Sequence, residues 1–150
     1  MELKIPPLVQ VVLAAIIIWL VDRFIAVAQF ETSWRVLIAV FCFTSGILFG
    51  VLGVSTFGKA KTTVNPEKPE RASRIVSHGI YSWTRNPMYL GLTLVLIAWS
   101  LYLGTLIGLV VVILFVAYIT KFQIVPEERI LAEKFGEDYQ TYRETVRRWF

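Results

Sequence analysis

GIYSWTRNPMYLG, residues 79–91, leads the chain through an Arg-Asn-Pro junction into a stretch that stays uncharged from Asn86 to Thr120. Asn is favoured just before a helix and Pro at its first position, so a helix is predicted to begin at Pro87. The uncharged stretch has 35 residues, whereas one crossing of a bilayer needs about 20. Gly104 lies near its middle and is a natural break between two helices. We therefore predict a hairpin of two short membrane spans, over residues 87–102 and 105–121.

Two more uncharged stretches lie nearer the N-terminus, with 17 residues over Ile5–Val21 and 23 over Val36–Gly58. The second is long enough to cross a bilayer, and the first becomes so if the apolar residues Phe24–Ala28 extend it. Residues 26–28, Ala-Val-Ala, resemble a signal-peptidase site, but the charged pair Asp22-Arg23 just before it favours retention of the first helix. With 56% hydrophobic residues in 150, the chain is predicted to be an all-α integral membrane protein with about four transmembrane helices.

The basic residues are distributed unevenly around these spans. Residues 59–85 carry six Lys and Arg against two Glu, whereas the turn near Gly104 carries no charge. By the positive-inside rule, this loop and the C-terminal tail are cytoplasmic, and four crossings place the N-terminus there as well. We therefore expect a multi-pass protein of the cell (inner) membrane with both termini in the cytoplasm. The net charge of +4 suits anionic lipid headgroups, and no nucleic-acid motif accompanies it.

The junction before Pro87 is a candidate binding site at the membrane surface. A helix N-terminus offers unpaired N–H groups and positive potential, and Arg85 adds a fixed cation, so a carboxylate or phosphate would fit there. The spacing leaves a second interpretation equally open, in which Arg85 only anchors the helix at the headgroups. Tyr81 and Trp83 are similarly ambiguous, because aromatic residues also form the interfacial belt of membrane proteins.

The C-terminal tail opens with Pro126-Glu127-Glu128, a pattern that suits the start of a helix. Apolar and aromatic residues follow at helical spacing and predict an amphipathic helix, with a break or kink expected at Gly136. These residues are Leu131, Phe135, Tyr139, Tyr142, Val146 and Trp149. If this helix packs over the 59–86 loop, Glu127 and Glu128 come close to Arg85 and Tyr89. The resulting pocket would suit a zwitterion such as S-adenosylmethionine, whose sulfonium aromatic faces attract.

Taken together, the motif over Gly79–Gly91 and the tail motif resemble the isoprenylcysteine carboxyl methyltransferase and phospholipid methyltransferase superfamily. The tail motif comprises Glu127-Glu128-Arg129, Phe135-Gly136 and Tyr139, and the resemblance covers residues 58–149. It implies an integral-membrane, S-adenosylmethionine-dependent methyltransferase without a Rossmann domain. We expect a single domain, with two N-terminal transmembrane helices in residues 1–57 and a cofactor-binding catalytic core in residues 58–150.

The resemblance also implies roles for individual residues. Catalytic roles are expected for Arg85, Tyr89 and Glu128. The expected cofactor-binding residues are His78, Gly79, Ile80, Tyr81, Arg85, Asn86, Pro87, Tyr89, Gly91, Glu127 and Glu128. Trp83, Arg147 and Arg148 are expected to contact the substrate, although anchoring at the interface is an alternative role for the two arginines. Many members of the superfamily have His where this chain has Asn86, so a titratable group is missing here.

The methyl acceptor is expected to be a membrane lipid or another lipophilic molecule with a carboxylate or an amine. An in-line transfer mainly requires positioning of the nucleophile against the methyl group. Cys42 is the only cysteine, so no disulfide or Cys/His metal cluster is expected within one chain, and no protein partner is inferred. Two alternatives stay open, an NADPH-dependent membrane reductase of the sterol-reductase type and a non-catalytic membrane interaction protein. Cofactor binding by the purified protein distinguishes the three.

Overall fold

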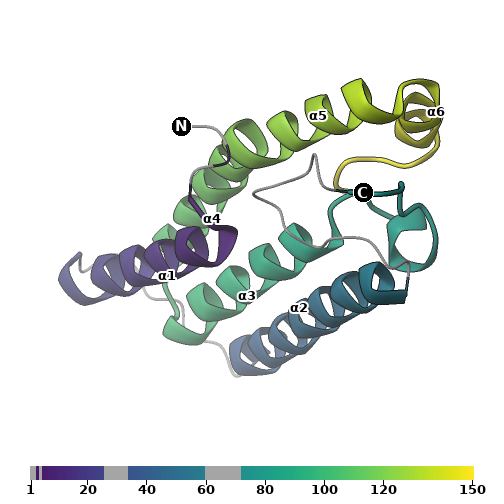
Figure 1. Cartoon of the computed structure of the whole chain (residues 1–150). Helices are drawn as coiled ribbons and strands as arrows, with labels where there is room; N and C mark the ends of the chain where they lie inside the picture. Colours follow the sequence, from purple (N-terminus) through teal and green to yellow (C-terminus); the bar gives the residue numbers. More distant parts are fainter. Residues whose placement is uncertain (1–2, 4, 26–33, 60–71) are drawn as a thin grey trace.

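The computed structural model describes residue 3 and residues 5–25, 34–59 and 72–150. These residues form six α-helices, one 3₁₀ turn and one π-helical turn, and no strand occurs among them (Figure 1). In chain order the elements are α1 (Pro7–Phe24), α2 (Trp34–Lys59), η2 (Gly79–Ser82), α3 (Pro87–Leu103), α4 (Leu106–Ile119), η3 (Thr120–Ile124), α5 (Val125–Phe135) and α6 (Glu137–Thr145). The predictions made for residues 26–28 and for most of the loop after Lys59 lie outside the described residues.

Three helical stretches are long and apolar enough to cross a membrane, namely Pro7–Phe24, Trp34–Gly58 and Leu106–Phe135. A shorter apolar helix, Pro87–Leu103, completes the hairpin. Large apolar side chains on these helices point outward, as Phe41 with 70% and Ile113 with 66% of their surface exposed illustrate. Helices that are apolar on every side belong in a bilayer. The prediction of an all-α integral membrane protein is confirmed.

The hairpin turns at Gly104, as predicted. Its φ of 79° is in the left-handed region, and its N–H donates to the carbonyls of Ser100 and Leu101 at the end of α3. Ser100 Oγ also donates to the carbonyl of Thr105, at 2.7 Å. Glycine adopts this conformation without the steric cost that a Cβ would add, so it allows α3 and α4 to join in two residues.

The second helix of the hairpin extends much further than the predicted end at residue 121. α4 continues through the π-helical turn η3 into α5, so Pro126 does not start a new helix. A proline inside an α-helix lacks an N–H and clashes with the carbonyl four residues earlier. A π turn shifts the hydrogen-bond register by one residue, which accommodates the proline within a continuous helix. Glu127 and Glu128 therefore project from the side of a long helix and not from its N-terminus.

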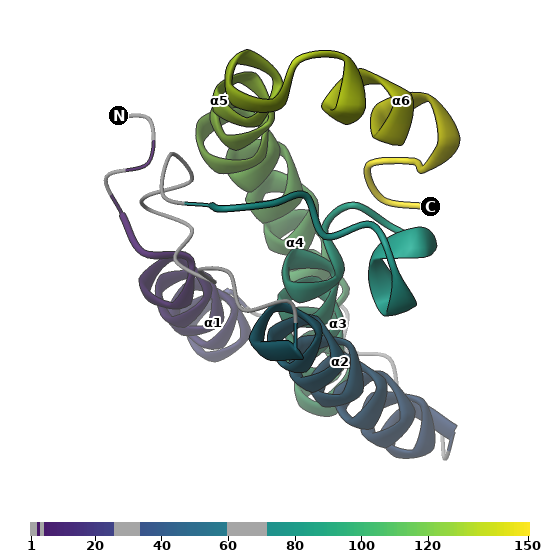
Figure 2. The same ribbon diagram turned by 45° about the vertical axis from the view of Figure 1, so that its right-hand side comes forward.

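α2 and α3 lie side by side and antiparallel (Figure 2). Their closest approach is at Gly46 and Gly91, where a Cβ added to Gly91 would lie 2.6 Å from the Gly46 carbonyl oxygen. On the other side of α3, α1 packs against both α3 and α4. Ile18, Leu96 and Ile119 are fully buried in the core between these three helices.

α6 folds back over the segment that precedes η2. Gly136, with a φ of 55°, separates α5 from α6 and confirms the predicted break. Tyr139, Tyr142 and Val146 then pack with Leu131 and Phe135, together with Ile75 from the earlier segment. Trp149 departs from the predicted helix face, because the helix ends at Thr145 and the tryptophan packs against the main core instead.

Candidate active site

The candidate site lies where α3 begins, between α5, η2 and the C-terminal segment, residues 146–150. Arg85 is at its centre, and its side chain is 9% exposed. One guanidinium nitrogen, Nη2, lies 2.8 Å from Glu128 Oε1. Another, Nη1, donates to the carbonyls of Val146 at 2.6 Å and Arg143 at 3.0 Å. Of the two acids expected near Arg85 and Tyr89, Glu128 contacts Arg85, and the protein itself already binds the cation from several directions.

Glu128 binds a second arginine. Arg148 Nη2 lies 2.7 Å from Glu128 Oε2, and Arg148 Nε donates to Oε1 at 3.1 Å. The Glu128 side chain is 8% exposed, whereas that of Arg148 is 34% exposed. These hydrogen bonds raise the pKa of Arg148. Two guanidinium groups thus share one carboxylate, and the network keeps a net positive charge beside the start of α3.

The C-terminal segment is tied to the residues just before α3. The backbone N–H of Arg85 donates to the Arg147 carbonyl at 3.0 Å. Thr84 Oγ1 and Asn86 Nδ2 both donate to the Arg148 carbonyl, at 3.1 and 3.0 Å. The helix does begin at Pro87, but the Asn86 side chain does not cap it, because its amide is used to hold this carbonyl.

Glu127 points to different partners. Its Oε1 accepts hydrogen bonds from the Tyr89 hydroxyl at 2.5 Å and from Gln123 Nε2 at 2.6 Å. Tyr89 and Gln123 are buried, with 5% and 1% of their surface exposed, while Glu127 is only partly buried. Its second oxygen, Oε2, makes no hydrogen bond with the described part of the chain. A fixed carboxylate with an acceptor to spare is a suitable partner for an ammonium group or for hydroxyls.

Tyr81, on η2, adds a buried hydroxyl to this region. It is 4% exposed, and its hydroxyl has no hydrogen-bond partner among the described residues. Burial, the neighbouring Tyr142 and the charge of Glu127 raise the pKa of Tyr81, so the hydroxyl stays neutral and can donate. Tyr142 holds the backbone here, since its own hydroxyl donates to the Tyr81 carbonyl at 2.8 Å. Native proteins rarely leave a buried polar group unpaired, so this hydroxyl is a candidate contact for a ligand.

Some predicted site residues do not bury their side chains in this cluster. His78, Trp83 and Arg147 have exposed side chains, and Trp83 keeps 72% of its surface. Gly79 supplies the positive φ of 63° that opens η2, and Ile80 packs against the small cluster around Val76 and Tyr81. The functional roles expected for these residues stay predictions.

Gly91 and Pro87 have evident structural uses. A Cβ on Gly91 would clash with α2, and Pro87 is buried at the first position of α3.

The sequence interpretation missed Gln123, which donates a hydrogen bond to the same Glu127 oxygen as Tyr89. Its signal is a polar amide just after the uncharged run that ends at Thr120, four residues before Glu127, where helical side chains meet.

Comparison with known proteins places the chain in a family. The description of the matching family is phospholipid methyltransferase, and the match covers residues 34–138, well over half of the chain. The chain belongs to this family. Membership and the apolar helices together indicate a membrane methyltransferase.

Two relatives were found among curated proteins. An uncharacterized protein of Haemophilus influenzae is 48% identical over 62 residues, which are 41% of this chain and 98% of that protein. The protein-S-isoprenylcysteine O-methyltransferase of Saccharomyces cerevisiae is 30% identical over 112 residues, or 70% of this chain. The match covers 47% of the yeast protein, so this chain spans about half the length of that relative. No solved structure matches the chain significantly.

Proposed function

We propose that the chain is an S-adenosylmethionine-dependent methyltransferase that acts on a lipophilic acceptor carrying a carboxylate or an amine. Family membership supports the methyl transfer. The observation that carries the proposal further is the buried polar cluster at the start of α3. It contains a carboxylate oxygen of Glu127 with no partner in the described chain and the unpaired hydroxyl of Tyr81.

The residues present fit the cofactor. S-adenosylmethionine bears an ammonium group, a carboxylate and ribose hydroxyls, and it supplies a methyl group on positively charged sulfur. Glu127 Oε2 would accept from the ammonium group or a hydroxyl, and the Tyr81 hydroxyl would donate to an acceptor atom of the ligand. The rings of Tyr81 and Tyr89 provide aromatic faces that attract a cation. The net positive charge around Arg85 suits the carboxylate.

We further propose that Glu127 and Glu128 have different roles. Tyr89 and Gln123 hold Glu127 in one orientation, so it can contact the cofactor directly. Arg85 and Glu128 are engaged with each other and with the C-terminal segment, so they act by fixing that segment and α5 against α3. The catalytic roles expected for Arg85 and Glu128 are thus proposed to be positioning roles.

The side chains of the candidate site favour an acceptor whose nucleophile does not have to lose a proton before methyl transfer. A carboxylate attacks a methyl group in its ionised form, whereas an amine must first lose a proton. The described part of the site has no histidine, since His78 is exposed away from the cluster. Arg148 lines a surface hollow of about 460 Å³ together with Arg129 and Arg143 and the acids Glu128 and Glu133. An anionic headgroup would contact its three arginines.

We propose that both termini lie in the cytoplasm and that the membrane is the inner one. The basic residues of the 59–85 loop support this orientation. The hydrogen bond from the Leu3 N–H to the carbonyl of Phe122 in η3, at 3.1 Å, supports an N-terminus on the same side as the C-terminal segment.

Thermal unfolding of the detergent-solubilised protein tests the proposal. S-adenosylhomocysteine at 100 times its dissociation constant is expected to raise the free energy of unfolding by about 2.7 kcal/mol. NADPH at the same concentration is expected to leave the midpoint unchanged. A shift with NADPH alone would identify a reductase, and no shift with either would favour a non-catalytic protein.

A further inference from the structure

Gln10 is a buried amide on α1 whose oxygen the proposed function does not use. The residue is 7% exposed, and its Nε2 donates to the Ile5 carbonyl at 2.8 Å. Its Oε1 is buried as well, and within the described part of the chain it accepts no hydrogen bond. Folded proteins pair nearly all of their buried polar atoms, and an amide oxygen can accept two hydrogen bonds. The Gln10 oxygen is therefore a candidate contact for a hydrogen-bond donor of a ligand.

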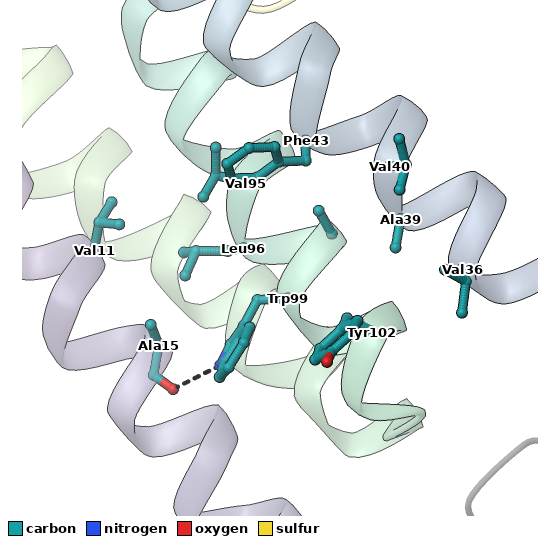
Figure 3. A pocket seen from close by; sticks show the side chains of 11 residues that line it. Val11, Ala15, Val36, Ala39, Val40, Phe43, Val95, Leu96, Trp99 and Tyr102 are labelled. Carbon is teal, nitrogen blue, oxygen red and sulfur yellow. Dashed lines mark hydrogen bonds between the residues drawn. The ribbon is translucent and has the colours of Figure 1, made fainter.

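Gln10 faces the packed core of the bundle. Ala14 and Ile18 follow it at helical spacing and are buried in the core that α1 forms with α3 and α4. Tyr89 of the candidate site belongs to the same cluster of buried side chains. Val11, the next residue, instead lines the apolar pocket on the α2 side of α1, which Gln10 does not line (Figure 3). Gln10 is thus on the side of α1 that faces the same core as Tyr89.

One contact between α1 and α3 fixes the depth of Gln10 in the bundle. The indole N–H of Trp99 donates to the Ala15 carbonyl at 3.2 Å, and Figure 3 shows the ring reaching from α3 to α1. The two helices run in the same direction (Figure 1). Gln10 comes five residues before Ala15, so it lies close to the level of Leu94, five residues before Trp99. Tyr89 lies five residues nearer the start of α3, roughly 7 Å along the helix axis.

The Gln10 side chain reaches back across much of this distance. A helical side chain tilts toward the N-terminus of its helix, and the hydrogen bond to the Ile5 carbonyl draws the amide the same way. The offset between α1 and α3 places Ile5 close to the level of Tyr89. The Gln10 amide therefore lies near the depth of Tyr89, on its membrane side. Arg85, which precedes α3, and Glu127, on α5, lie on the other side.

We propose that Gln10 determines specificity for the methyl acceptor, because its amide oxygen accepts a hydrogen bond from an N–H or O–H of that molecule. This inference rests on the proposed function. An acceptor that approaches from the bilayer reaches Gln10 on the membrane side of Tyr89, while the groups proposed to hold the cofactor lie on the other side. A carboxylate acceptor carries the donor on a neighbouring atom, and an amine carries it on the nitrogen. A site with a buried acceptor disfavours an analogue that lacks the donor.

The test uses two pairs of acceptors that differ in a hydrogen-bond donor. N-acetyl-S-prenylcysteine has an amide N–H beside its carboxylate, whereas S-prenyl-3-mercaptopropionate has a carboxylate without the N–H. Phosphatidylethanolamine keeps an N–H in its neutral, nucleophilic form, whereas its N,N-dimethyl derivative does not. Gln10→Met removes the amide and keeps a side chain of similar length. Leu8→Met, at an exposed position of α1, is the matched control.

Within the pair that the protein methylates, Gln10→Met is expected to lower kcat/KM about tenfold for the member with the N–H, the size of a hydrogen bond left unmade in a buried site. The member without the N–H should be methylated as before, so the comparison isolates the contact. Leu8→Met should match the unaltered protein. Equal losses for both members would assign Gln10 a structural role, and no loss would assign its oxygen to a bound water. Either result would overturn the proposal.

Gln10→Glu provides a rescue of the contact. Burial favours the neutral carboxyl, which can donate to the Ile5 carbonyl through one oxygen and accept from the ligand with the other. This variant is expected to recover much of the kcat/KM for the member with the N–H. A value as low as that of Gln10→Met would contradict the role of the oxygen.

Binding measured without turnover separates this proposal from the proposed function. S-adenosylhomocysteine should raise the thermal midpoint of the unaltered protein and of Gln10→Met equally, because Gln10 does not contact the cofactor. With S-adenosylhomocysteine bound, an acceptor with the N–H should raise the midpoint further, and less so in Gln10→Met. Weaker S-adenosylhomocysteine binding in Gln10→Met, or no stabilisation by any of the four acceptors, would overturn the proposal for Gln10. Failure of S-adenosylhomocysteine to stabilise even the unaltered protein would instead contradict the proposed function.

Discussion

Glu127 and Glu128 are neighbours in sequence, yet their carboxylates face different partners. Adjacent residues on a helix point in different directions, so α5 turns Glu127 toward Tyr89 and Gln123 and Glu128 toward Arg85 and Arg148. One carboxylate keeps an oxygen for a ligand, and the other is enclosed by two guanidinium groups. Substitution of each acid should therefore affect different properties of the protein.

Glu127→Gln is expected to weaken S-adenosylhomocysteine binding about tenfold, because a charge-assisted hydrogen bond contributes roughly 1.5–3 kcal/mol. The thermal midpoint without ligand should change little, since glutamine retains the size of the side chain and an acceptor for Tyr89. Isothermal titration measures the affinity. Glu133→Gln, an exposed acid on the same helix, is the control and should bind normally. Unaltered affinity in Glu127→Gln would remove this residue from the cofactor site.

Glu128→Ala is expected to act on stability. It leaves the buried Arg85 guanidinium without its carboxylate, and breaking one partner of a buried ion pair costs about 3–5 kcal/mol. The thermal midpoint should fall strongly, and trypsin should cleave more readily near Arg147 and Arg148 as the C-terminal segment loosens. A stable variant with only reduced ligand affinity would mean that Glu128 contacts the cofactor itself.

At the scale of elements, two backbone features determine how the helices around the candidate site lie against one another. The π turn η3 joins α4 to α5 without a break and thereby keeps Gln123 and Glu127 on one side, toward Tyr89. The close contact at Gly46 and Gly91 fixes α2 against α3, and it lies one turn below Pro87. Gly91 was expected to bind the cofactor, but its surroundings indicate that helix packing is sufficient to require glycine.

Replacing Gly91 and Gly50 by alanine tests whether Gly91 is required for helix packing or for cofactor binding. Gly91→Ala places a Cβ 2.6 Å from a backbone oxygen, and such overpacking costs typically about 1–3 kcal/mol. Gly50→Ala meets no atom within 4 Å, so it is expected to stabilise α2 by about 0.5–1 kcal/mol. Midpoints from thermal unfolding should shift in opposite directions. A stable Gly91→Ala protein that no longer binds S-adenosylhomocysteine would support the cofactor role instead.

For the whole molecule, most of the described chain forms apolar helices, and the polar site occupies one end of them. The C-terminal segment closes over the start of α3, and Trp149 packs against the core of the helices. A water-soluble acceptor would not require a site at this boundary, whereas an amphiphile in the bilayer already has its head at this depth.

Incubation of the protein with methyl-labelled S-adenosylmethionine and a native lipid extract tests whether the acceptor is an amphiphile of the bilayer. Label is expected in the organic phase after extraction, because the proposed acceptor is a lipid-like amphiphile. Glu127→Gln, with its weakened cofactor binding, serves as the control and should give less organic label at a limiting concentration of S-adenosylmethionine. Label only in small water-soluble products, from fully active protein, would exclude a membrane acceptor.

The sequence by itself determined the helices that cross the membrane, because long uncharged runs have few other stable structures. It also located the start at Pro87, the turn at Gly104 and the break at Gly136, since proline and glycine constrain the backbone locally. The amphipathic tail further predicted that the acids come close to Arg85 and Tyr89 if the tail packs over the 59–86 loop. Only the tertiary structure decided that Glu128 pairs with both Arg85 and Arg148 and that Asn86 holds the C-terminal segment. These contacts join residues 20, 43 and 62 positions apart in the sequence. Local patterns do not specify such contacts, because which partner a buried polar group finds depends on how the helices pack together.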